Sequence, residues 1–200
     1  MARWLAAAGV LSPIVLAAVA LGVASGRADY SQASQTLSEL GAIGRPGAAT
    51  MNWFGIIPAG VLITLSSPVV AAWFGRGTLS RIGGVMLGAG GLLLSASALT
   101  PWRGGLPRAL RESANARHLL LAAAGFVLIG LAPLCFGLHG SRSSSHRARS
   151  WLSIVAGVLI LALAAGQVET RYQGAFQKGA LAVFYAWLSG TCAVILVSRR

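Results

Sequence analysis

The sequence predicts an all-α protein, a polytopic bundle of six transmembrane helices. Of its 200 residues, 56% are hydrophobic and only 10% are charged, a balance that a soluble domain of this size rarely has. The apolar residues gather in six segments that reach, or nearly reach, the roughly 20 residues needed to cross a hydrocarbon core of about 30 Å. Arginines cluster between these segments, as loop charges do between membrane spans.

The six expected spans form one bundle over residues 1–200. They cover residues 4–25, 52–74, 82–100, 118–138, 151–168 and 180–197. The first segment also has the form of a signal peptide, but its full spanning length favours a retained helix. The third span is rich in glycine, and Gly84 and Gly88 form a GxxxG step that allows close backbone approach. We therefore expect the third span at the centre of the bundle.

The formal charge of +12 does not predict a nucleic-acid partner, because the arginines are dispersed in short clusters rather than gathered into one basic surface. Cys135 and Cys192 lie in apolar segments and have no metal-binding spacing, so no metal or other cofactor is expected. Six spans place both termini on one side of the membrane. Lysine and arginine divide equally between the sides, but all four acidic residues fall on the side opposite the termini, which favours cytoplasmic termini.

The first loop, on the non-cytoplasmic side in this orientation, is too polar to span and is patterned as a short amphipathic helix. Ser31 has the right chemistry to cap its start and Gly41 to end it. Ala33, Leu37 and Leu40 would then line one apolar stripe. Such a helix would lie at the membrane surface and cover the bundle.

Polar residues of the first, third and fifth loops can meet at this end of the bundle. One interpretation is a lipid- or isoprenoid-directed enzyme, in which His118 is a general base and Ser38 a nucleophile or an orienting hydroxyl. Glu39 or Glu169 would be the partner of that pair. The residues expected to bind a ligand or to dock the loop are Tyr30, Ser31, Ser38, Glu39, Glu169 and Arg171.

A structural interpretation of the same residues is also open. Glu39 would pair with Arg171 or Arg117 and fasten the loop helix to the bundle. His118 would then cap the fourth span at the membrane boundary, where an ionisable group costs little.

The first loop resembles the head motif of the bacterial domain-of-unknown-function 998 family, a Tyr-Ser pair followed by Ser-Glu-Leu-Gly-Ala and a proline. The matching residues are Tyr30, Ser31, Ser38, Glu39, Leu40, Gly41, Ala42 and Pro46, with weaker matches at His118, Gly166, Arg171 and Trp187. This resemblance implies a six-span protein of the bacterial inner membrane with no assigned activity. The arginine-rich third loop, with a single histidine, departs from the acidic, histidine-bearing loop of that family and argues against a two-histidine metal site. The first loop is also similar to that of the Frag1/DRAM/Sfk1 proteins, which are linked to lipid handling.

Three functions are compatible with this sequence. The first is an accessory or scaffold protein that binds membrane lipid, a membrane-protein partner or a second copy of itself. The second is the lipid-directed enzyme described above. The third is a small-molecule transporter, for which an ionisable residue deep in a span would be expected.

Overall fold

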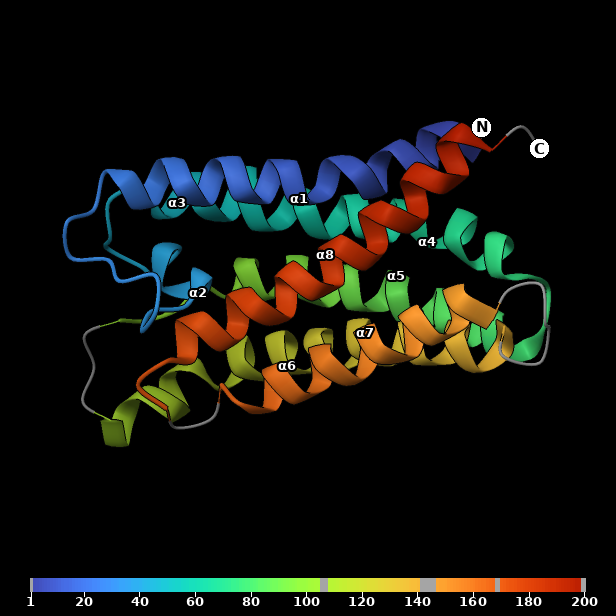
Figure 1. Cartoon of the computed structure of the whole chain (residues 1–200). Helices are drawn as coiled ribbons and strands as arrows, with labels where there is room; N and C mark the ends of the chain where they lie inside the picture. The colour runs from blue at the N-terminus through green and yellow to red at the C-terminus, as the bar shows by residue number, and fades with distance from the viewer. Residues whose placement is uncertain (1, 105–107, 141–146, 168–169, 199–200) are drawn as a thin grey trace.

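The computed structural model describes residues 2–104, 108–140, 147–167 and 170–198, and within these ranges the chain is helical with no strand (Figure 1). Six helical segments are long and apolar enough to cross a membrane, which confirms the predicted fold class. The elements are α1 (Ala2–Ser25), α2 (Leu37–Leu40), α3 (Ala48–Thr50), the π-helix η1 (Met51–Ile56), α4 (Ile57–Phe74), α5 (Thr78–Leu99), α6 (Arg108–Gly140), α7 (Arg147–Ala165) and α8 (Gln173–Val197).

Several helices extend beyond the apolar segments that predict them. α6 begins at Arg108, well before His118, and α8 begins at Gln173 rather than at Ala180. The polar residues at these helix starts do not interrupt a helix, because hydropathy marks where a span enters lipid and not where the backbone hydrogen bonds begin. The second span is continuous from α3 through η1 to α4, and a single π-helical stretch is a feature often found near functional sites.

Consecutive helices α4, α5, α6 and α7 pack side by side, α1 packs on α4, and α8 returns across the bundle to contact both α1 and α7. Figure 1 shows α8 crossing the bundle diagonally between α1 and α7. Half of the apolar window of α5 is buried, the largest share among the six spans. The spans form a ring, however, in which α5 packs between α4 and α6, so the expected position at the centre of the bundle is wrong. Glycine allows α5 to approach α4 closely: a Cβ on Gly91 of α5 would lie 2.7 Å from Thr64 Oγ1 of α4.

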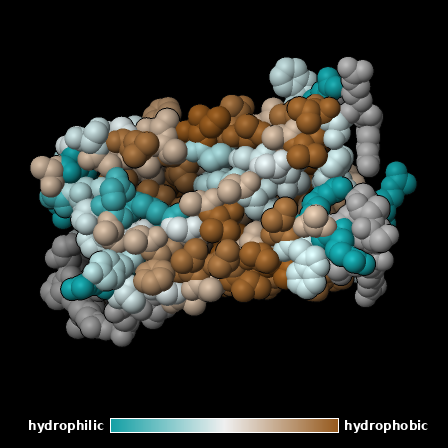
Figure 2. All heavy atoms as spheres, in the orientation of Figure 1, coloured by the Kyte–Doolittle hydropathy of each residue, from teal (hydrophilic) through white to brown (hydrophobic). Residues whose placement is uncertain are grey.

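Both termini lie at one end of the bundle, and the first loop lies at the other (Figure 1). We call this second end the distal pole; its described loops are residues 26–47, 100–104 and 170–172. The view in Figure 2 has an apolar belt around its middle and hydrophilic residues toward both ends, which is the surface expected of a bundle standing across a bilayer.

Candidate functional site

Residues 26–47, here called the lid loop, carry the short helix α2. Thr36, not Ser31, precedes its first residue, and the backbone N–H of Thr36 donates to Glu39 Oε1 at 3.2 Å. The predicted start after Ser31 is therefore wrong. Ser31 instead closes a separate turn, in which Gln35 N donates to Ser31 O at 2.9 Å. The predicted end at Gly41 is confirmed.

The shorter helix changes which side chains face the bundle. Leu40 is fully buried and Leu37 is partly buried, as the apolar stripe predicts. Ala33 is exposed, because it lies in the turn before α2 rather than on the helix. It contacts α8 through its backbone, where its carbonyl accepts a hydrogen bond from Ala175 N at 2.8 Å.

The first turns of α8 hold the lid loop in place. Lys178 Nζ donates to Gln32 O at 2.8 Å and to Gln35 O at 2.6 Å. The buried side chain of Gln177 accepts a hydrogen bond from Leu37 N through Oε1 at 2.7 Å, which satisfies a free donor at the start of α2. A Cβ on Gly174 would collide with the backbone of Gln35, so only glycine permits this approach.

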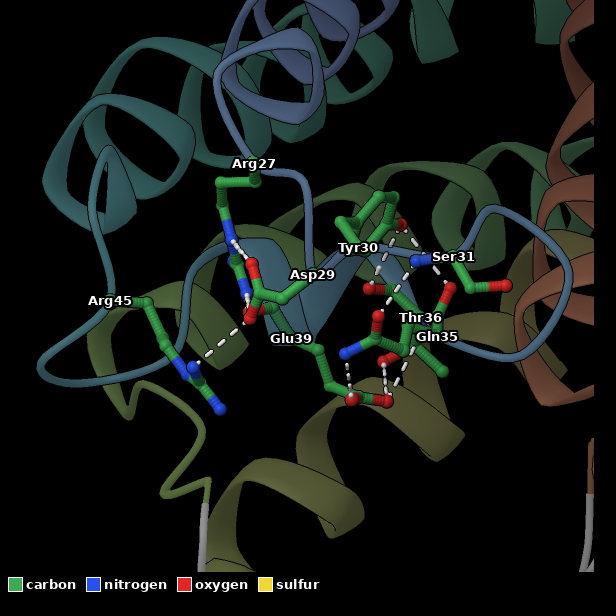
Figure 3. Close-up of polar contacts among 8 residues, drawn as sticks. All are labelled: Arg27, Asp29, Tyr30, Ser31, Gln35, Thr36, Glu39 and Arg45. Atoms are coloured by element: carbon green, nitrogen blue, oxygen red, sulfur yellow. Dashed lines mark hydrogen bonds and ion pairs between the residues drawn. The ribbon is translucent and has the colours of Figure 1, made fainter.

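A charged cluster ties the two ends of the lid loop together (Figure 3). Arg27 is buried, and its guanidinium donates to both carboxylate oxygens of Asp29 at 3.3 Å and to the backbone oxygen of Glu39 at 3.1 Å. Arg45 Nη1 adds a 3.1 Å ion pair to Asp29. The hydrogen bond from Arg27, helped by the charges of both arginines, lowers the pKa of Asp29. Partial burial, with the Glu39 charge second, raises the pKa of Tyr30 to about 12.

Ser38 of the lid loop is in direct contact with His118 of α6. His118 Nε2 lies 2.9 Å from Ser38 Oγ, and Nδ1 lies 2.9 Å from the backbone oxygen of Ser97 and 3.0 Å from that of Thr100. Only 4% of His118 is exposed. The ring of Trp102 packs edge-on against the imidazole, with the centroids 5.7 Å apart. The imidazole is therefore fixed by its partners on both nitrogens and by an aromatic wall.

A cavity opens below Ser38 into the centre of the bundle. The space in it that a water-sized sphere can reach is about 50 Å³. Its walls are mainly aliphatic and come from α1, α4, α5, α6 and α8, and its polar groups come from Ser38, Ser97, Gln177 and Tyr185. Apolar walls with a few polar groups are the usual lining of a small-molecule site.

Comparison with known proteins assigns the family. The profile of the family described as "Protein of unknown function (DUF998)" matches residues 6–194, nearly the whole chain. The chain belongs to the DUF998 family. No curated protein matches this DUF998 chain, and no solved structure matches it.

The other candidate residues of this DUF998 protein are placed differently from the two sequence-based interpretations. The Glu39 carboxylate accepts hydrogen bonds from Gln35 and Thr36 (Figure 3). Among the described residues it is bonded to neither His118 nor an arginine side chain. The Arg171 guanidinium lies over the ring of Tyr172, 4.8 Å from its centroid. Glu169 lies outside the described residues. Within those residues, no group of three histidine, cysteine or acidic side chains is arranged to hold a metal ion.

Sequence reasoning missed the residues of α8 that meet the lid loop. Gln177 and Lys178 were not selected because the last span was expected to begin at Ala180. Two adjacent polar residues next to an otherwise apolar segment are the signal that could have identified them. Asn52 was also missed; its side-chain amide donates to Gly41 O at 2.9 Å and so fixes the end of α2.

Proposed function

We propose that this DUF998 protein binds a membrane lipid, with a hydrocarbon chain in the central cavity and the polar part of the lipid under the lid loop. The cavity below Ser38 is the observation that carries this proposal. Its occupant must match walls built from leucine, isoleucine, alanine and phenylalanine, and its position is inside a bundle that is itself surrounded by lipid. An acyl chain is the apolar ligand present at the highest concentration in that environment.

Selectivity for such a lipid has to come from the polar end of the cavity. Lipid tails are as apolar as leucine, so transferring a chain from the bilayer into the protein gains little hydrophobic free energy. Hydrogen bonds inside the low-dielectric bundle contribute more, because an unpaired polar group there is costly. Ser38 and Gln177, both at the lid end of the cavity, are the groups we expect to meet a carbonyl or hydroxyl of the lipid.

The wider setting of this function also belongs to the proposal. We place the protein in the bacterial inner membrane with cytoplasmic termini, which puts the distal pole outside the cytoplasm. A membrane-protein partner or a second copy of the chain fits an accessory role for the same lipid-loaded bundle. Transport is the weaker alternative, since the described contacts at the distal pole fasten the lid loop to α8.

A photo-crosslinking experiment tests the binding. The purified protein would be placed in phosphatidylglycerol nanodiscs that contain a phospholipid with a diazirine on one acyl chain, and the crosslinked residues would be mapped by mass spectrometry. Crosslinks to Phe126 and Leu181, which line the cavity, are expected. Ala122→Trp, which fills the cavity from α6, should remove them, whereas Ala123→Trp, at an exposed position on the same helix, should not. Crosslinks confined to the outer surface, or unchanged in Ala122→Trp, would exclude the proposed site.

A further inference from the structure

We infer that Ser38 is a nucleophile, that His118 is its general base, and that the pair takes an acyl group from a lipid ester held in the central cavity. The inference rests on the proposed lipid binding and adds a reaction to it. Three independent features support it. They are the tautomer that the surroundings impose on His118, an amide donor at Gln177, and the apolar cavity that Ser38 and Gln177 both line.

The surroundings of His118 determine which nitrogen carries the proton. Nδ1 faces two backbone carbonyl oxygens, those of Ser97 and Thr100, and a carbonyl can only accept a hydrogen bond. Nδ1 must therefore be the protonated nitrogen of the neutral ring. This leaves the lone pair of Nε2 for the hydroxyl of Ser38, which donates across 2.9 Å.

This arrangement is the one that activates a serine. A nucleophile lies within hydrogen-bond reach of a base, and a third group orients the base. Here the orienting groups are two main-chain carbonyls instead of a carboxylate, so they stabilise the protonated ring by their dipoles. Burial behind Trp102 keeps bulk water from competing for Nε2.

Gln177 supplies a donor for the negative charge that such an attack creates. Its Oε1 is used by Leu37 N, so its amide nitrogen is left pointing elsewhere. The described residues place no hydrogen bond on this Nε2, and only 7% of Gln177 as a whole is exposed. Gln177 and Ser38 line the same cavity. An amide N–H that opens into the cavity of the nucleophile has the chemistry of an oxyanion-stabilising group.

The reaction can be written with all atoms balanced. Ser38 Oγ forms a bond to the carbonyl carbon of the lipid ester as its proton moves to His118 Nε2. The bond from that carbon to the alkoxy oxygen then breaks, and His118 returns the proton to the leaving alcohol. The oxygen of a water molecule then bonds to the acyl carbon as His118 accepts a proton from it. The bond from that carbon to Ser38 Oγ breaks, His118 returns the proton to Ser38 Oγ, and the carboxylic acid leaves. The net reaction consumes one ester and one water and produces one acid and one alcohol.

A purely structural role predicts a different behaviour. If the hydrogen bond between Ser38 and His118 only fastened the lid loop, Ser38 would be no more reactive than Ser34, an exposed serine of the same loop. If Ser38 is the nucleophile, a fluorophosphonate will modify it selectively, since this reagent forms a stable bond to activated serine oxygens.

The test uses two fluorophosphonates, one with an ethyl and one with a dodecyl chain, on the unaltered protein in nanodiscs, with sites mapped by mass spectrometry. We expect dodecyl labelling at Ser38 and not at Ser34, unchanged labelling in Ser34→Ala, and a rate about 10²- to 10⁴-fold lower in His118→Gln, the range for loss of a general base. His118→Gln and Ser38→Ala would be checked for folding by size-exclusion profile and by thermal unfolding in detergent.

The outcomes separate the two proposals. An unmodified Ser38 in a protein whose cavity still crosslinks the diazirine lipid would overturn the nucleophile and leave lipid binding intact. Equal labelling of Ser38 by both reagents, without cavity crosslinks, would support Ser38 as the nucleophile and exclude lipid binding in the cavity. Labelling that persists at full rate in a folded His118→Gln protein would exclude the assigned base.

Discussion

His118 Nε2 and Ser38 Oγ are 2.9 Å apart although His118 belongs to the long membrane helix α6 and Ser38 to the lid helix α2. A hydrogen bond of this kind is lost when its atoms separate beyond about 3.5 Å. A movement of the lid loop by about 1 Å is therefore enough to disconnect the pair. The hydrogen bonds that dock the lid loop on α8 also determine the geometry of this site.

Lys178→Met is expected to loosen the lid loop. The substitution removes two hydrogen bonds from an ammonium group to backbone oxygens, together worth roughly 1.5–3 kcal/mol because the bond to Gln32 O is exposed to water. Amide hydrogen exchange over residues 35–40 should become about tenfold to a hundredfold faster. Arg171→Met is the matched control, because that exposed side chain of the same pole lies over Tyr172. Equal exchange in wild type and Lys178→Met would show that Lys178 does not hold the loop.

Two glycines of α8 provide a test of the close approach between this helix and the lid loop. Gly174→Ala should displace the loop, since the new Cβ would collide with the backbone of Gln35, which has no side-chain freedom with which to yield. Gly179→Ala places its Cβ 3.6 Å from Leu163 Cδ1, an ordinary contact, and should be neutral or slightly stabilising. Trypsin cleavage after Arg27, which is buried in the docked loop, measures the difference: faster cleavage is expected in Gly174→Ala alone. A protected loop in Gly174→Ala would contradict the docked arrangement.

The fold was predictable because lipid imposes a simple rule, that a spanning segment is long and apolar. Ser38 follows the first span and His118 follows the third. Because two spans separate them, the sequence also places both residues at the same end of the bundle. Their contact was not predictable, since the two residues are 80 positions apart and meet only through the docking of the lid loop. The start of α2 was misplaced for a local reason: Ser31 and Thr36 are both good capping residues, and the reach of Glu39 back to Thr36 decides between them.

The packing of α5 on α4 is expected to be sensitive to added volume. In Gly91→Ala the new Cβ would lie 2.7 Å from Thr64 Oγ1 and 3.0 Å from Thr64 N, so the two helices must separate. Overpacking of this kind costs roughly 1–3 kcal/mol. The Tm in detergent should fall by several degrees, whereas Gly190→Ala, whose Cβ would meet no atom within 4 Å, should leave it unchanged or raised. Equal Tm values for the two variants would mean that α4 and α5 are not in this close contact.

Tyr30 gives the lid loop a predictable response to alkali. Its hydroxyl lies 3.2 Å from Gln35 O, to which it donates as a neutral phenol, and partial burial raises its pKa to about 12 from the ordinary value of 10. A raised pKa means that folding disfavours the phenolate. The contribution of Tyr30 to docking is therefore complete below about pH 10 and is lost as the pH rises through 12.

The tyrosinate absorbance of the wild type minus that of Tyr30→Phe isolates this one group from the other tyrosines. We expect a midpoint near pH 12 in the folded protein and near pH 10 in denaturant, because the unfolded chain exposes the phenol and separates it from the Glu39 charge. In Tyr30→Phe the free energy of docking the lid loop at neutral pH should be less favourable by about 1 kcal/mol, the net value of one hydrogen bond. A midpoint of 10 in the folded protein would show that Tyr30 is exposed to water and that the lid loop does not lie against α8.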